Sequence, residues 1–162
     1  MAIAMLSWIL AIPLLGLTTG LRSMTPMAVL CWYSYLGLLP VDGTWAQWTA
    51  RTSTVAVFTV LAIGECVLDK LPRTTDRISP GPLLVRILLG GLVGSIAATA
   101  IDGPGIEGVL LGVVGAALGA FGGFMIRRDL VEQIGCADWK VAVVEDLITV
   151  LLACFALHVV VS

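Results

Sequence analysis

Charged residues are scarce in this chain of 162 residues, and this scarcity restricts the class of protein. Only 12% of the residues are charged and 59% are hydrophobic, whereas a soluble domain carries roughly 25% charged residues. The mean hydropathy is +1.04. So few charges cannot cover the surface of a soluble domain, and we expect one integral membrane domain over residues 1–162, in contact with the lipid bilayer.

Signals of catalytic or metal chemistry are also few. The four cysteines are widely spaced without a CxxC pair, and there is one histidine. No GxSxG, HExxH or P-loop pattern occurs, and no three ligand-type side chains have metal-site spacing. The net charge is -2 and there is no basic run. We therefore expect no enzyme, no metal or other cofactor, and no nucleic-acid partner.

Long apolar regions make up most of what is present. Five of them, at about 2–39, 53–68, 83–101, 108–126 and 141–161, approach or exceed the roughly 20 apolar residues that a spanning helix needs. The alternating ten-residue pattern of a spanning barrel is missing. These regions predict an all-α fold, a polytopic transmembrane helix bundle.

The first region is too long for one simple helix, at about 55 Å against a hydrocarbon core of about 30 Å. We predict a break between Gly20 and Pro26, because proline lacks an amide donor and disfavours helix at the preceding residue. Two alternatives stay open, giving five or six membrane segments. Either the break lies within one crossing and the N-terminus is inside, or the chain turns back and the N-terminus is outside.

Basic residues indicate the orientation. Arg51 belongs to one side, and seven residues belong to the other: Lys70, Arg73, Arg77, Arg86, Arg127, Arg128 and Lys140. The positive-inside tendency then places the 70–82 and 127–140 connections in the cytoplasm and the C-terminus outside. A chain that turns back near Arg22 agrees better with this tendency, because Arg22 then lies near the cytoplasm.

Glycines recur at helical spacing in two of the regions. They stand at positions 108, 112, 115, 119 and 122 of the fourth region, and Gly90 and Gly94 stand in the third. Small residues on one helix face let backbones approach closely in lipid. They predict tight packing within one subunit, the interface of a homo-oligomer such as a dimer, or a helix that slides during transport, and the sequence does not separate these alternatives.

Ionisable residues at membrane depth are the candidate site. Besides Arg22, they are Glu65 and Asp69, which share a helix face, Arg127 and Arg128 at the end of the fourth region, and Glu145 and Asp146 early in the fifth. All fall at the cytoplasmic level in the orientation above. We expect one layer of alternating charge that binds a substrate or ion, because buried charges tend to pair and to mark a pathway.

Arg22 is the only charged residue among the first 41, and it needs a carboxylate partner at this depth. Glu65 is the first candidate partner because apolar residues flank it, and Glu145 is the second. For Asp69, Arg127 and Arg128, snorkelling of the side chain to the membrane surface is the alternative interpretation.

Three segments together resemble a known family. "GLRSMTPMAVL", "ECVLDKLPRTTD" and "VVEDLITVLLA" are similar to the domain of unknown function 4126 family of small bacterial polytopic membrane proteins. Gly20, Arg22 and Pro26 match its first motif approximately. Its E-x-x-x-D-K-x-P motif is matched by Glu65, Asp69, Lys70 and Pro72, and its ED pair by Glu145 and Asp146. The resemblance implies a bacterial inner (cytoplasmic) membrane protein and adds no substrate.

A faint echo, "GLTTGLR" against "GAFGGFMIRR", is compatible with the inverted repeats and broken helices of transporters. We expect a small membrane transporter or channel for a small anionic solute or lipid headgroup, since Arg22 lies beside the positive end of the helix that follows the break. The alternative function is a non-enzymatic membrane-structural or lipid-binding protein.

Overall fold

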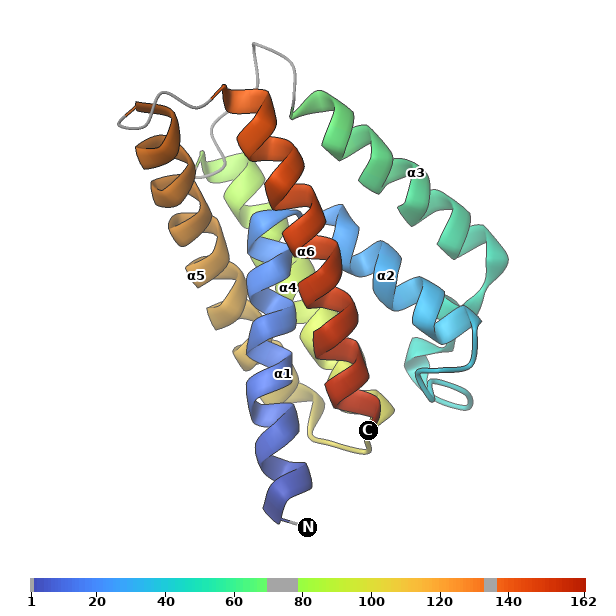
Figure 1. Cartoon of the computed structure of the whole chain (residues 1–162). Coiled ribbons are helices and arrows are strands. Elements are labelled where there is room, and N and C mark those ends of the chain that lie inside the picture. Colours follow the sequence, from blue (N-terminus) through green and yellow to red (C-terminus); the bar gives the residue numbers. More distant parts are fainter. Residues whose placement is uncertain (1, 70–78, 133–136) are drawn as a thin grey trace.

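The computed structural model describes residues 2–69, 79–132 and 137–162, with side chains from Trp8 onward. These residues form α-helices, one 3-10 helix and no strand (Figure 1). In chain order the elements are α1 (Ala2–Leu21), α2 (Met24–Tyr35), η1 (Trp45–Ala50), α3 (Thr52–Leu68), α4 (Pro80–Ala100), α5 (Gly105–Glu132) and α6 (Asp138–Val161). The predicted all-α class is confirmed.

Three helices, α4, α5 and α6, are long and apolar enough to cross a membrane, and they indicate an integral membrane protein. Two shorter apolar helices are α3 and the Trp8–Leu21 part of α1. The connection predicted at 127–140 is shorter than expected, because α5 continues to Glu132 and α6 begins at Asp138. Most of the 70–82 connection lies outside the described residues, and α4 already begins at Pro80.

The first apolar region contains two helices. α1 ends at Leu21 and α2 begins at Met24, so Arg22 and Ser23 lie between them. α2 then runs back obliquely from that end of α1, and the two chain termini lie toward the same end of the bundle (Figure 1). Pro26 lies in the first turn of α2, where backbone amides have no partner within the helix, so its missing donor does no harm.

Packing joins the helices through α2, which contacts α6, α1 and α4 as well as α3 and η1. α1 packs against α4, α5 and α6, and α4 also packs along α5. Among the described residues, the main contacts of α3 are with α2 and η1. The middle of the bundle is apolar and closely filled, with fully buried side chains that include Ile12, Leu15, Met27, Leu30, Ile96 and Leu157.

Glycines bring α5 into backbone contact with two helices of the same chain. A Cβ atom added at Gly112 would overlap the carbonyl oxygen of Gly90 on α4, and one added at Gly119 would overlap that of Leu17 on α1. Gly122 differs, because a Cβ there would meet nothing within 4 Å. A dimer stays a prediction, and the contacting glycines already serve packing within the chain.

The two segments of the sequence echo end α1 and lie in the second half of α5. These helices pack side by side and run in the same direction (Figure 1). An inverted repeat requires oppositely directed halves, so this echo gives no support to the repeat, which stays a prediction.

Candidate functional site

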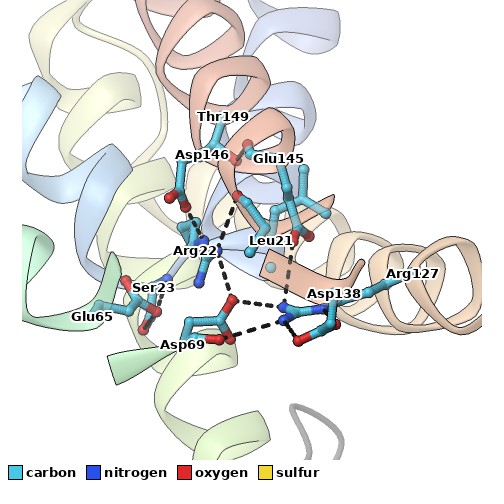
Figure 2. Close-up of polar contacts among 12 residues, drawn as sticks. Leu21, Arg22, Ser23, Glu65, Asp69, Arg127, Asp138, Glu145, Asp146 and Thr149 are labelled. Carbon is cyan, nitrogen blue, oxygen red and sulfur yellow. Dashed lines mark hydrogen bonds and ion pairs between the residues drawn. The ribbon is translucent and has the colours of Figure 1, made fainter. Parts of the chain in front are cut away.

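Arg22 is fully buried at the junction of α1 and α2 (Figure 2). Its Nη2 atom lies 2.7 Å from Oδ2 of Asp69, at the end of α3. Its Nε atom lies 2.6 Å from Oδ1 of Asp146 on α6. Nη2 also donates a hydrogen bond of 3.4 Å to the carbonyl oxygen of Ala142. One arginine therefore joins the end of α1 to two other helices.

The sequence-based choice of partners for Arg22 is wrong, since Asp69 and Asp146 take the places expected for Glu65 and Glu145. Residues four apart on a helix share a face but differ in height by about 6 Å, which separates Asp69 from Glu65. Neighbouring residues point about 100° apart, which separates Asp146 from Glu145. Apolar flanks show that a carboxylate needs a partner, but they do not show where the carboxylate points.

Arg127, on the last turns of α5, forms the second centre of the site (Figure 2). Its Nε and Nη2 atoms bind the two carboxylate oxygens of Asp138 at 2.7 and 2.8 Å, which is a bidentate pair. Its Nη1 atom lies 2.6 Å from Oδ2 of Asp69, the same oxygen that contacts Arg22, and 3.9 Å from Oε2 of Glu145. Asp69 thus bridges two arginines from different helices.

The interruption between α1 and α2 is held by Glu65 and Arg86. Oε1 of Glu65 accepts from the Ser23 amide at 2.8 Å and from its hydroxyl at 2.6 Å, and Oε2 accepts from the Met24 amide at 2.8 Å. Nη1 of Arg86 on α4 donates to the carbonyl oxygens of Gly20 and Leu21, both at 2.7 Å. A carboxylate therefore caps the start of α2 and a guanidinium caps the end of α1.

This double cap pairs backbone groups that the two helix ends leave open. Inside a bilayer such groups would be destabilising without a partner, because no water replaces the lost bonds. The two capping side chains also face each other, with Nη2 of Arg86 3.7 Å from Oε1 of Glu65. The junction is thus stabilised by side chains from α3 and α4, far along the chain, and moving either helix would disturb the junction.

We call the residues that meet at this end of the bundle the charged layer: Arg22, Glu65, Asp69, Arg86, Arg127, Asp138, Glu145 and Asp146. Six of the seven candidates from the sequence lie in it. Arg128 does not, because its side chain is 51% exposed and contacts its neighbour Asp129 at 3.5 Å.

Sequence reasoning missed Arg86 and Asp138 as site residues. Counting basic residues assigns Arg86 to a cytoplasmic connection, whereas the structure places it inside α4 with only 6% of its surface exposed. The available signal was its isolation in the apolar run "LLVRILL", the same signal that singles out Arg22. Asp138 carried no such signal, because it stands in the first turn of α6 beside a polar segment.

A groove of about 640 Å³ lies between α3, α4 and the junction of α1 with α2. Its lining combines two kinds of side chain. The charged part comes from Arg22, Glu65, Asp69 and Arg86, and the apolar part includes Val60, Leu61, Leu68 and Val85. In the described parts of the chain, no three histidine, cysteine or acidic side chains are arranged to hold a metal ion.

One known protein family matches nearly the whole chain. The sequence pattern of a domain of unknown function, DUF4126, matches residues 9–162. The chain belongs to the DUF4126 family. The match includes all of the charged layer, so both the junction and its capping residues lie within the DUF4126 domain. No curated protein and no solved structure matches the chain.

Proposed function

We propose that this DUF4126 protein is a small, non-enzymatic membrane transporter for an amphiphile, a molecule with a polar headgroup and an apolar part. The groove between α3 and α4 carries the proposal, because its lining is charged at the junction and apolar along the helices. A small hydrophilic ion would gain nothing from the apolar wall. A purely apolar molecule would gain nothing from the buried arginines.

The arrangement of the helices supports movement of one part against another. Backbone contacts through glycine hold α1, α4 and α5 closely together, and a filled apolar core blocks a direct path between the two ends. In contrast, α3 packs mainly on α2 and η1. We infer that α3 moves against the rest of the bundle, so that the groove opens and closes beside a headgroup.

The charge of the substrate needs a separate argument. The sequence suggests an anion at the start of α2, but Glu65 already occupies the amides of Ser23 and Met24. An anionic group in the groove would instead be held by the guanidinium groups of Arg22 and Arg86.

We also propose that the charged layer faces the cytoplasm of a bacterial inner membrane, with the C-terminus outside. In a chain without its native cysteines, Ser79→Cys should react with a membrane-impermeant thiol reagent only after the cytoplasmic side is opened. Thr44→Cys should react in intact cells. Labelling in the opposite pattern would reverse this orientation.

Transport is tested by reconstituting the protein into vesicles that contain a trace of phospholipid with a fluorescent acyl chain. A membrane-impermeant quencher then reports how fast lipid moves between leaflets. We expect faster movement than in protein-free vesicles. Gly64→Leu should abolish the gain, because Gly64 lines the groove and a Cβ there meets nothing within 4 Å, so the new side chain fills the groove without disturbing its walls.

The matched control is Gly122→Leu, which also adds a side chain in open space but stands on α5, away from the groove. It should transport like the parent. If the parent moves no lipid faster than protein-free vesicles while lipid copurifies with it, the transporter proposal fails in favour of a lipid-binding or structural protein.

A further inference from the structure

The described lining of the groove is balanced in charge. Among the residues that the structure describes, two guanidinium groups line it, from Arg22 and Arg86, and two carboxylates, from Glu65 and Asp69. A ligand with net charge would bring uncompensated charge into a site of low dielectric constant, which is strongly unfavourable. A ligand that carries one positive and one negative group adds no net charge and can contact both kinds of side chain.

The arginine side of the groove lacks an acceptor. The Nη1 atom of Arg22 has no hydrogen-bond partner in the described part of the chain, although the side chain is fully buried. In Figure 2, a nitrogen of Arg22 that no dashed line reaches points toward the gap between Glu65 and Asp69. A buried donor without an acceptor is destabilising. A phosphate oxygen in this gap would satisfy the donor with a charge-assisted hydrogen bond.

The carboxylate of Glu65 can accept a further hydrogen bond from a ligand. Each carboxylate oxygen can accept about two hydrogen bonds. Oε2 of Glu65 receives one from the Met24 amide, so it can accept another without releasing the cap of α2. An ammonium group with free N–H donors fits this position, whereas a trimethylammonium group has the same charge and no donor.

We propose that the groove binds a phospholipid with a primary ammonium in its headgroup, its phosphate beside Arg22 and Arg86 and its ammonium beside Glu65. This proposal rests on the proposed transport function and names the class of molecule that would be transported. The apolar wall favours a lipid over a soluble zwitterion, since Val60 and Leu61 lie about one turn along α3 from Glu65, on the path that an acyl chain would take. The exposed fraction of Val60 is 67%, so its surface is available.

Competition between headgroups tests this assignment. The protein is reconstituted into vesicles with equal amounts of ethanolamine, choline and glycerol phospholipids, extracted in mild detergent, and the copurifying lipids are quantified by mass spectrometry. The choline lipid keeps the phosphate and net charge but lacks N–H donors. The glycerol lipid keeps the phosphate but lacks the ammonium. We expect about tenfold enrichment of the ethanolamine lipid over both, the effect of one charged hydrogen bond.

Variants locate the effect. Gly64→Leu should lose the enrichment, and Gly122→Leu should keep it. Glu65→Gln keeps an acceptor for α2 but loses the negative charge, so it should reduce discrimination between the ethanolamine and choline lipids. Equal copurification of the three lipids with the parent, preference for the glycerol lipid, or full enrichment in Gly64→Leu would each overturn the assignment. Displacement of the lipid by soluble phosphoethanolamine at equal concentration would also overturn it.

Measuring lipid movement in the same vesicles shows whether the headgroup assignment or the transporter proposal has failed. Enrichment of the ethanolamine lipid without faster movement between leaflets supports the headgroup site and removes the transporter. Faster movement of all three lipids without enrichment keeps the transporter and overturns the headgroup site.

Discussion

Gly112 and Gly90 bring α5 and α4 into backbone contact, whereas Arg22 joins α1 to α3 and α6 through two carboxylates. Both devices hold helices together in a solvent where burial of apolar side chains provides little driving force between helices. They differ in what they allow. Backbone contact has one close-fitting geometry, while a layer of several arginines and carboxylates has alternative pairings. The comparison suggests a fixed body of α1, α4 and α5 beside an adjustable layer.

The largest effect should follow from removing the centre of the charged layer. Arg22→Met has a similar volume but leaves Asp69 and Asp146 without their arginine at this position. Breaking a buried ion pair in this way costs about 3–5 kcal/mol of stability. We expect a large drop in the thermal unfolding midpoint in detergent, or little folded protein. A midpoint equal to that of the parent would show that the layer adds nothing to stability.

Double-mutant cycles examine which carboxylates act with Arg22. Changes at Arg22 and Asp69, and at Arg22 and Asp146, should be non-additive, because each pair is in contact. Arg22→Met and Glu65→Gln should be closer to additive, since Glu65 contacts the backbone of Ser23 and Met24. Stronger coupling of Arg22 to Glu65 than to Asp69 would contradict the pairing in the structure.

The next effect should come from the glycine contact. Gly112→Leu places a side chain where the carbonyl oxygen of Gly90 lies, so α4 and α5 must separate. Overpacking of this kind costs about 3 kcal/mol, and the unfolding midpoint should fall. The control Gly122→Leu has open space around its Cβ and should unfold at nearly the parent temperature. Equal midpoints for the two variants would remove the distinction between a fixed body and its surroundings.

These two regions also differ in how far the sequence predicts them. The glycine spacing is local, because helical periodicity alone places positions 108, 112, 115 and 119 on one face. Local spacing does not show whether that face packs against the same chain or another one. In the structure it packs against α1 and α4 of the same chain. The predicted face also includes Gly122, where an added Cβ would meet nothing within 4 Å. The repeat alone does not show where the contact between helices ends.

For the charged layer, the sequence predicts which residues belong to it better than it predicts which of them form ion pairs. Hydropathy singles out Arg22, Glu65 and Glu145 as charges at membrane depth, because each interrupts an apolar run. The partners depend on the height and rotation of helices that are distant in sequence, which no local pattern records. The capping of α1 by Arg86 belongs to the same class, since it joins groups 65 and 66 positions apart.

A smaller effect on stability should follow from Glu65→Gln, which tests the junction of α1 and α2 separately from the α4–α5 contact. Glutamine has one carbonyl oxygen in place of two carboxylate oxygens, so one of the bonds from Ser23 and Met24 is weakened or lost. Loss of a cap costs about 1 kcal/mol. Hydrogen exchange should speed up at the amides of Ser23 and Met24 while the amides of the α4–α5 contact stay protected. Unchanged exchange at the junction would mean that Glu65 is not its cap.

The smallest effect should come from Arg128→Gln, at the edge of the layer. Arg127 and Arg128 are neighbours in sequence, yet Arg127 binds both oxygens of Asp138, while Arg128 is half exposed and contacts Asp129 at 3.5 Å. An exposed pair of this kind is screened by solvent, so we expect a change within about 0.5 kcal/mol. Arg127→Gln should cost more, because Asp69 and Asp138 lose a shared donor. Thermal unfolding of both variants, at low and high salt, checks the difference. If Arg128→Gln is the more damaging change, the boundary of the charged layer lies beyond Arg127.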